Sequence, residues 1–103
     1  MNGRLDFDKI NRAALAALPA IVARLLPDGK AISGEWTARN PRRADKHAGS
    51  FKINLRTCKW SDFATGDKGG DAVSLVAYLE GVSQGEAARL LSQMLGMGGA
   101  NGR

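Results

Sequence analysis

The chain of 103 residues has only one cysteine, Cys58, and one histidine, His47. A lone cysteine cannot form an intramolecular disulfide, and unpaired thiols are typical of reducing compartments. The first residues contain no apolar segment of the kind that a signal peptide carries. No apolar run approaches the ~20 residues that a membrane span requires. These absences predict a cytoplasmic protein without a membrane partner.

Recognisable catalytic patterns are also absent. His47 has no Ser or Cys beside it in a nucleophile–base arrangement, and residues 65–70 lack the Gly-x-x-x-x-Gly-Lys spacing of a phosphate loop. Three carboxylates, Asp62, Asp67 and Asp71, are close together in the sequence. A site for a hard cation such as Mg²⁺ is therefore an alternative that stays open. Acids before a helix serve more often as caps and turn formers. The sequence therefore predicts a protein that is not an enzyme and holds no cofactor or metal.

Positive charge is abundant and unevenly distributed. The net charge is +5, and seven of the fifteen lysines and arginines lie between positions 39 and 59, with Asp45 as the one acid there. A basic segment of this density can neutralise phosphates, which is the main sequence-independent source of nucleic-acid affinity. The alternative is a solvated basic face that only keeps the protein soluble.

The N-terminal third predicts two helices. Apolar residues recur at intervals of three and four between positions 7 and 26. Pro19 has no backbone N–H, so we expect a break there, with Pro19 in the first turn of the second helix. Asp6 or Asp8 is the expected N-cap of the first helix. A turn at residues 27–29 ends this part.

Residues 32–63 predict a small antiparallel β-ribbon or sheet, which makes the chain α+β. Phe51, Ile53 and Leu55 alternate with polar residues at the two-residue period of a half-exposed strand. We expect strands at residues 35–38, 51–55 and 59–63, with a turn at 56–58.

The same period places Lys52, Asn54 and Arg56 together on the exposed face. If Trp36 shares that face, basic and aromatic groups interleave as they do on surfaces that bind single-stranded nucleic acid. The alternative is that both tryptophans pack in the core. We favour this alternative for Trp60. The predicted DNA-binding residues are Arg39, Arg42, Arg43, Lys46, Lys52, Asn54, Arg56, Lys59 and Trp36.

The C-terminal part predicts two more helices after a glycine-rich loop. The glycines at 66, 69 and 70 are interpreted as allowing a tight turn between strand and helix. Asp71 is the expected cap of a helix that closes at Gly81, and Ser83 with Glu86 has the spacing of a capping box before a helix over 87–94. We expect one domain over residues 1–96, with the ribbon core at about 32–80 and a flexible tail at 97–103.

Two motifs, GSFKINL at residues 49–55 and WSDFATGDKGGD at 60–71, resemble the ribbon and helix start of a known domain. It is the zinc-binding, zinc-ribbon domain that begins bacterial and phage DNA primases. The resemblance covers about residues 36–79, and the segment 40–71 looks like the zinc-less variants attached to prophage and plasmid primases. It implies a metal-free, zinc-ribbon-like sheet that is preceded and followed by helices along the chain.

In that family, zinc is held by Cys-x-x-His before the ribbon and Cys-x-x-Cys after it. The match puts Asn40 and Arg43 near the first pair and Phe63 and Gly66 near the second, so none of the four is a zinc ligand. Without zinc, a folding contribution of ~10 kcal/mol must come from elsewhere. We expect Phe63 and Trp60 to replace it by packing against the flanking helices.

The resemblance implies a module that binds single-stranded template DNA and assists primer synthesis in the replication of a mobile element, a prophage or plasmid. The catalytic primase, polymerase or helicase would act in trans or in a longer chain. Two other classes of function stay open. One is a protein-interaction subunit of a replication complex that does not touch DNA, and the other is a carboxylate–metal nucleotidyltransferase component.

Overall fold

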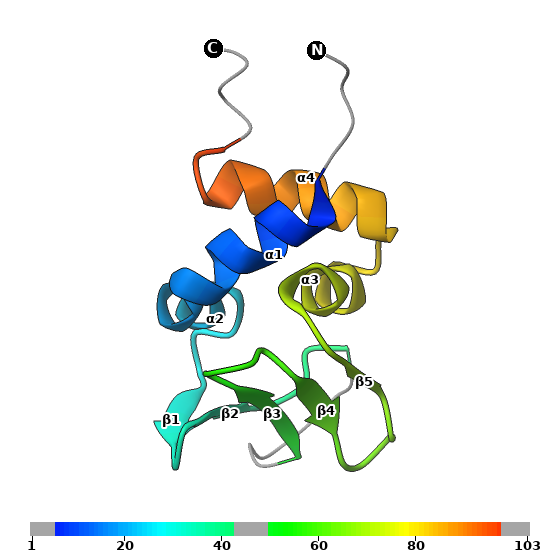
Figure 1. Cartoon of the computed structure of the whole chain (residues 1–103). Coiled ribbons are helices and arrows are strands. Elements are labelled where there is room, and N and C mark those ends of the chain that lie inside the picture. The colour runs from blue at the N-terminus through cyan, green and yellow to red at the C-terminus, as the bar shows by residue number, and fades with distance from the viewer. Residues whose placement is uncertain (1–5, 43–49, 98–103) are drawn as a thin grey trace.

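Helices and strands occupy separate layers of this protein. The computed structural model describes residues 6–42 and 50–97. These residues form four helices and one five-stranded antiparallel sheet, and all four helices lie on the same side of the sheet (Figure 1). The predicted α+β class is confirmed. Within the same residues, no helix is both long enough and apolar enough to cross a membrane.

The first two helices form as predicted. Helix α1 spans Phe7–Ala16, and its cap Asp6 accepts a hydrogen bond of 3.0 Å from the backbone N–H of Lys9. Helix α2 spans Leu18–Leu25, with Pro19 in the first turn, where its missing N–H would have no partner within the helix. The predicted break before Pro19 is therefore confirmed.

Helix α3 spans Ala72–Glu80 and is capped at both ends as predicted. The Asp71 carboxylate accepts a hydrogen bond of 2.8 Å from the backbone N–H of Ser74, and the Ser74 hydroxyl completes a capping box. Gly81 ends the helix with φ +68°, a left-handed conformation that favours glycine. The capping residues Asp71 and Gly81 therefore set both bounds of this helix.

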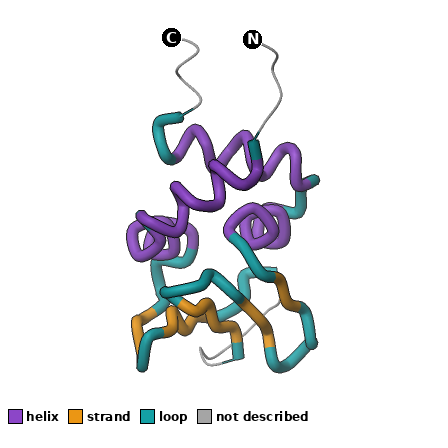
Figure 2. The backbone as a smooth tube through the Cα atoms, in the orientation of Figure 1, coloured by secondary structure: helices purple, strands orange, loops and turns teal. Residues whose placement is uncertain are grey.

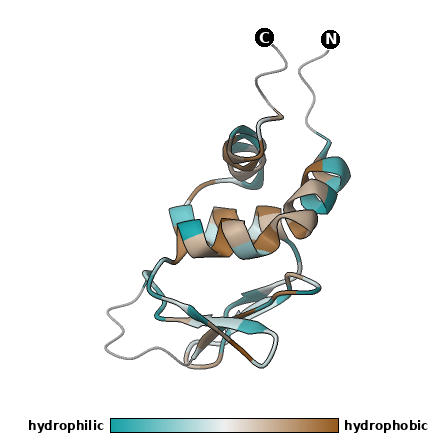
Figure 3. Cartoon of the chain, turned by 90° about the vertical axis from the view of Figure 1, so that its left-hand side faces the viewer, coloured by the Kyte–Doolittle hydropathy of each residue, from teal (hydrophilic) through white to brown (hydrophobic). Residues whose placement is uncertain are grey.

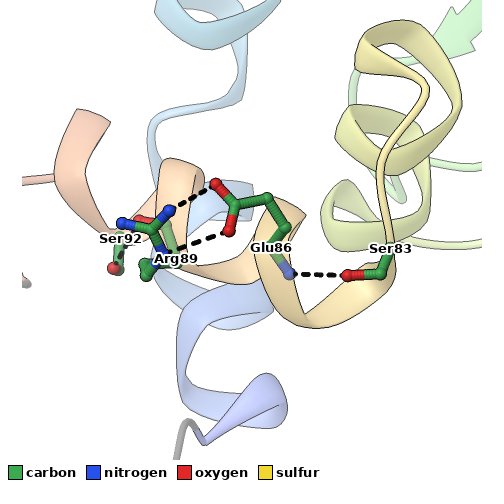
Figure 4. A network of polar contacts seen from close by, with 4 residues as sticks. All are labelled: Ser83, Glu86, Arg89 and Ser92. Atoms are coloured by element: carbon green, nitrogen blue, oxygen red, sulfur yellow. Dashed lines mark hydrogen bonds and ion pairs between the residues drawn. The ribbon is translucent and has the colours of Figure 1, made fainter.

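Helix α4 spans Gln84–Met94 and begins at the predicted cap. The Ser83 hydroxyl accepts a hydrogen bond of 3.1 Å from the backbone N–H of Glu86 (Figure 4). The Glu86 carboxylate accepts a hydrogen bond of 3.2 Å from the Nε of Arg89, instead of the hydrogen bond from the backbone N–H of Ser83 that a capping box would have. Past the helix, Met97 is half-buried and packs against the core, so the predicted tail does not begin before residue 98.

The sheet has its strands in sequential order, each antiparallel to the next. The strands lie together in one layer, apart from the helices (Figure 2). The second, third and fourth strands were predicted, whereas the first and fifth were not. The two missed strands are only three and two residues long, too short to show a period. The strands are β1 Lys30–Ile32, β2 Glu35–Ala38, β3 Phe51–Asn54, β4 Trp60–Asp62 and β5 Lys68–Gly69.

The sheet has an inner face under the helices and an outer face away from them. Phe51 and Ile53 of β3 are fully buried, and Trp60 of β4 is 5 % exposed. They pack with apolar side chains of the helices, where the hydrophobic residues gather (Figure 3). The predicted alternation of β3 and the predicted core position of Trp60 are confirmed.

The prediction that the glycines at 66, 69 and 70 allow a tight turn holds for Gly66 alone, because Gly69 belongs to β5 and neither Gly69 nor Gly70 has a positive φ. Gly66 has φ +84°, and Gly69 lies under the indole ring of Trp60. A Cβ on Gly69 would lie 2.5 Å from Trp60 Nε1 and 2.6 Å from Ser74 Oγ. Those two atoms are themselves joined by a hydrogen bond of 3.1 Å, so β5 approaches α3 closely only because residue 69 has no side chain.

A buried polar network joins the sheet to α3. Asn40, 1 % exposed, follows β2, and Asp62, fully buried, ends β4. The Asn40 Nδ2 donates to the Asp62 carboxylate at 2.7 Å and to the Tyr78 hydroxyl of α3 at 2.8 Å. The Tyr78 hydroxyl donates in turn to Asp67 at 2.7 Å.

Tyr78 remains a donor in this network. Burial raises the pKa of its hydroxyl, and the hydrogen bond from Asn40 opposes that rise. The hydrogen bond to Asp67 and the charges of Asp67 and Asp62 raise the pKa further. The hydroxyl is therefore protonated at neutral pH and can hold the β4–β5 turn against the helix.

We expect Asn40→Ala to lower the free energy of unfolding by about 2 kcal/mol, since a buried carboxylate and a tyrosine hydroxyl each lose a hydrogen-bond donor. Urea unfolding followed by circular dichroism measures the change. Gln93→Ala, which truncates an exposed amide on α4, is the control. Equal free energies of unfolding for the two variants would show that the hydrogen bonds of Asn40 do not stabilise the fold.

Gly69→Ala is expected to destabilise the fold by about 1–3 kcal/mol, because the added methyl group overlaps the Trp60 ring. Gly70→Ala is the matched control, since a Cβ at position 70 meets no atom within 4 Å. Thermal unfolding of both variants compares them directly. A melting temperature for Gly69→Ala at or above that of Gly70→Ala would contradict the close approach of β5 to α3.

Candidate nucleic-acid interface

The outer face of the sheet carries a straight row of lysines and hydroxyl groups. Residues directly opposite one another on neighbouring antiparallel strands share a face. Because neighbouring strands are ~4.8 Å apart, lysines on alternate strands are separated by about 10 Å. The row crosses all five strands in the order Lys30, Thr37, Lys52, Ser61 and Lys68. Lys30 and Lys68 are exposed, Lys52 and Ser61 are half-buried, and Thr37 is buried at 7 % exposure.

A fourth lysine continues this face beyond the end of β4. The backbone N–H of Asn54 donates to the carbonyl of Lys59 at 2.8 Å, which extends the pairing of β3 with β4 by one residue. Lys59 is exposed. Glu35, opposite Asn54, is the one acid that the described strands place on this side. We call Lys30, Lys52, Lys59 and Lys68, with Thr37 and Ser61, the outer lysine face.

Phe63 also lies on the outer side, where it was not expected. Its backbone N–H donates to the Ser50 carbonyl at 2.9 Å, and its ring is 69 % exposed. The Lys52 Nζ lies 5.7 Å from the centre of that ring. The prediction that Phe63 packs against the helices is wrong, because strand alternation turns it away from them once Trp60 points inward.

Trp36 does not belong to this face. Its partner across β2 and β3 is the buried Ile53, so the indole lies on the inner side of the sheet. The Nε1 donates to the carbonyl of Leu26 at 3.0 Å, and the ring is half-buried. The interleaving of Trp36 with the basic residues is therefore excluded by the strand register.

Asn54 and Arg56 occupy the end of β3. Asn54 is on the outer side, as the alternation predicted, but its Oδ1 accepts hydrogen bonds from the backbone N–H groups of Arg56 at 2.8 Å and Thr57 at 3.0 Å. Its oxygen is thus used to form the turn. Arg56 is exposed in that turn and not within the strand.

Arg39 and Arg42 have other neighbours than the lysine row. Arg39 forms an ion pair of 2.8 Å with Asp28, with side chains 49 % and 41 % exposed, a contact worth about 0–1 kcal/mol. The Arg42 Nη1 lies 2.8 Å from the point that a Cβ on Gly81 would occupy, near the end of α3. Arg43 and Lys46 lie outside the described residues. Among the described residues of the basic segment, only Lys52 and Lys59 are therefore assigned to the outer lysine face.

The three neighbouring carboxylates have structural partners on the helix side of the sheet. Asp62 accepts from Asn40, Asp67 accepts from Tyr78, and Asp71 caps α3. Among residues 6–42 and 50–97, no group of three or more His, Cys, Asp or Glu side chains is placed to hold a metal.

Cys58 is not a reactive thiol. It is 2 % exposed in the turn between β3 and β4. Burial, and secondarily the charge of Asp71, raises the pKa of its thiol to about 12. The thiolate, which is the nucleophile and the metal ligand, is therefore scarce at neutral pH.

Sequence reasoning missed Lys30, Lys68 and Phe63. The two lysines lie in the short strands β1 and β5, for which the sequence carries no period. Phe63 could have been found, because the two-residue alternation that puts Trp60 inside places residues 61 and 63 outside.

The outer lysine face thus combines four ammonium groups, the half-buried Ser61 hydroxyl and a neighbouring exposed ring on the side of the sheet opposite the helices (Figure 1), whereas Thr37 is only 7 % exposed. Such a surface suits an extended polyanion with unpaired aromatic bases. Comparison of the chain with protein-family models, with curated proteins and with solved structures gave no match.

Proposed function

We propose that this protein binds single-stranded DNA through the outer lysine face, as a non-catalytic accessory module of primer synthesis in the replication of a prophage or plasmid. The observation that carries the proposal is the row of lysines on alternate strands, opposed on that face of the described strands by Glu35 alone. Each ammonium group can neutralise one phosphate and release its counterion. This function would place the protein in the cytoplasm.

The shape of the face favours a single strand. Reading a duplex in its major groove requires a helix or a ribbon that enters the groove. The described helices all lie on the opposite side of the sheet (Figure 1). A broad sheet surface with cations and an exposed ring instead suits a strand whose backbone lies across it with its bases unpaired.

The resemblance to the primase zinc domain supports the replication context. Strands β3 and β4, then a glycine-rich turn and α3, follow the order that the family has. Asn40, at a position that matches a zinc ligand, is hydrogen-bonded at 2.7 Å to Asp62, the neighbour of Phe63 in the second pair. This bond joins the two segments that zinc joins in the family, which supports a zinc-ribbon-like domain that folds without metal.

The partner would be a primase, polymerase or helicase, supplied by another chain or by a longer version of this one. Structural roles for Asp62, Asp67 and Asp71 favour this accessory role over a carboxylate–metal nucleotidyltransferase. A protein-interaction subunit that does not contact DNA is the remaining alternative, and the binding experiment below separates it from our proposal.

Removal of divalent metal should leave the protein folded. We expect the melting temperature to be the same before and after dialysis against a strong zinc chelator, because no described cluster of ligands is available. Elemental analysis of the purified protein provides the parallel measurement. Stoichiometric zinc, together with a fall in melting temperature on chelation, would contradict the metal-free fold.

Changing Lys30, Lys52 and Lys68 to Gln should weaken binding to single-stranded DNA. The slope of log K against log salt concentration should fall by about 2, since each phosphate contact to a single strand contributes ~0.7. Fluorescence anisotropy with a labelled oligonucleotide at several salt concentrations measures both quantities.

The control triple variant changes Lys9, Arg12 and Arg24, three exposed cations of α1 and α2, to Gln. It removes the same net charge from the helical side and should retain the parent slope. Equal loss in both variants would mean that net charge alone drives binding. If the parent chain does not bind DNA at low salt, the proposed function is wrong and the protein-interaction subunit is the hypothesis that stays.

A further inference from the structure

Phe63 is the most exposed large apolar side chain of the described residues, at 69 %, against 53 % for Ile32, 40 % for Leu15 and 36 % for Phe7. The hydrophobic core that the described residues form does not include this ring. Of the six aromatic residues in the chain, Phe51, Trp36, Trp60 and Tyr78 lie on the inner side of the sheet or in α3, and Phe7 lies in α1. Phe63 is therefore the one aromatic ring on the outer side.

The ring lies beside the centre of the lysine row. Lys52, on the middle strand, has its Nζ 5.7 Å from the ring centre. Phe63 is two residues along the chain from Ser61, the neighbour of Lys52 in the row, so it is displaced from the row by about 7 Å along β4. This displacement is close to the separation between the phosphate and the base of one nucleotide.

From this placement we propose that Phe63 and Lys52 form a stacking site for one unpaired nucleobase of a single-stranded nucleic acid. The base stacks on the Phe63 ring while the Lys52 ammonium pairs with the adjacent phosphate. The inference rests on the proposed function and adds to it the residue that distinguishes single strands from duplexes.

The physical reason for the distinction is the availability of the base face. Every nucleobase has a π-face, so stacking on an aromatic ring is tolerant of sequence. In a duplex those faces are covered by neighbouring base pairs, and exposing one requires the base to be unpaired and unstacked. The lysines alone would bind both forms through their phosphates, so the preference for a single strand depends on Phe63.

Phe63→Leu tests the site, because it keeps an apolar side chain and removes the aromatic ring. We expect affinity for single-stranded DNA to fall by about 5- to 100-fold, the range for loss of one base–aromatic stack. The salt slope and the affinity for duplex DNA should be unchanged. Phe7→Leu, the same substitution at an exposed ring of α1, is the control and should bind as the parent does.

An abasic site at each position of a short oligonucleotide in turn gives a second, independent measurement. Abasic DNA keeps the phosphates and removes the stacking partner. At one position, the parent and Phe63→Leu should therefore bind the abasic strand equally while differing on the intact strand. An RNA strand of the same sequence separates DNA from RNA as the source of the base. Phe63→Leu is expected to lower the affinity for the DNA and for the RNA strand equally, since stacking does not involve the sugar.

Fluorescence of Phe63→Trp reports the contact directly. The indole at position 63 should be quenched when a single strand binds, whereas the parent, whose Trp36 and Trp60 lie on the inner side of the sheet, should respond little.

The outcomes separate the two proposals. If the parent binds single strands and the lysine variant loses salt slope, but Phe63→Leu matches Phe7→Leu, the stacking site is wrong and the proposed function stands. If the parent binds neither DNA nor RNA, both are overturned.

Discussion

The hydrogen bond between the Asn40 amide and the buried Asp62 carboxylate is the constraint on which the rest of this structure depends. A carboxylate removed from water is destabilising by several kcal/mol unless polar groups surround it. Here Asn40 reaches it from the end of β2 and, with the same Nδ2 atom, reaches Tyr78 of α3. One amide thus ties together two strands and a helix that are distant in the sequence.

The orientation of β4 follows from that bond. With Asp62 directed to the helix side, alternation also places Trp60 inside and leaves Ser61 and Phe63 outside. Trp60 then packs against Tyr78 and Phe51 and donates to Ser74, which requires glycine at position 69. A side chain that satisfies one buried charge therefore also determines which groups the sheet presents to solvent.

Charge is sorted between the two sides of the sheet by the same arrangement. The acids of the β4–β5 region serve as hydrogen-bond acceptors for Asn40, Tyr78 and the start of α3, so they lie on the helix side. The lysines, which have no such partner there, lie on the outer side. The row from Lys30 to Lys68 consequently contains no carboxylate, and Glu35 is the one acid that the described strands place beside it.

Local signals in the sequence were sufficient for much of the fold. Caps at Asp6, Asp71 and Ser83 and the proline at position 19 set the helix bounds, because these residues act on backbone groups within one turn of themselves. The two-residue alternation of β3 was equally local. The α+β class, the four helices and the core position of Trp60 could all be predicted on this basis.

The candidate site was different, because a shared surface depends on which strands become neighbours. The sequence by itself determined that the chain is basic and that Lys52 faces outward. Only the tertiary structure decided that Lys30 and Lys68 join Lys52 across β1 and β5, that Trp36 turns inward opposite Ile53, and that Arg39 pairs with Asp28 while Arg42 lies near Gly81. β1 and β5 have only three and two residues and, unlike the equally short β4 with Trp60, contain no aromatic residue that marks a strand, so they form only because longer neighbours supply their hydrogen bonds.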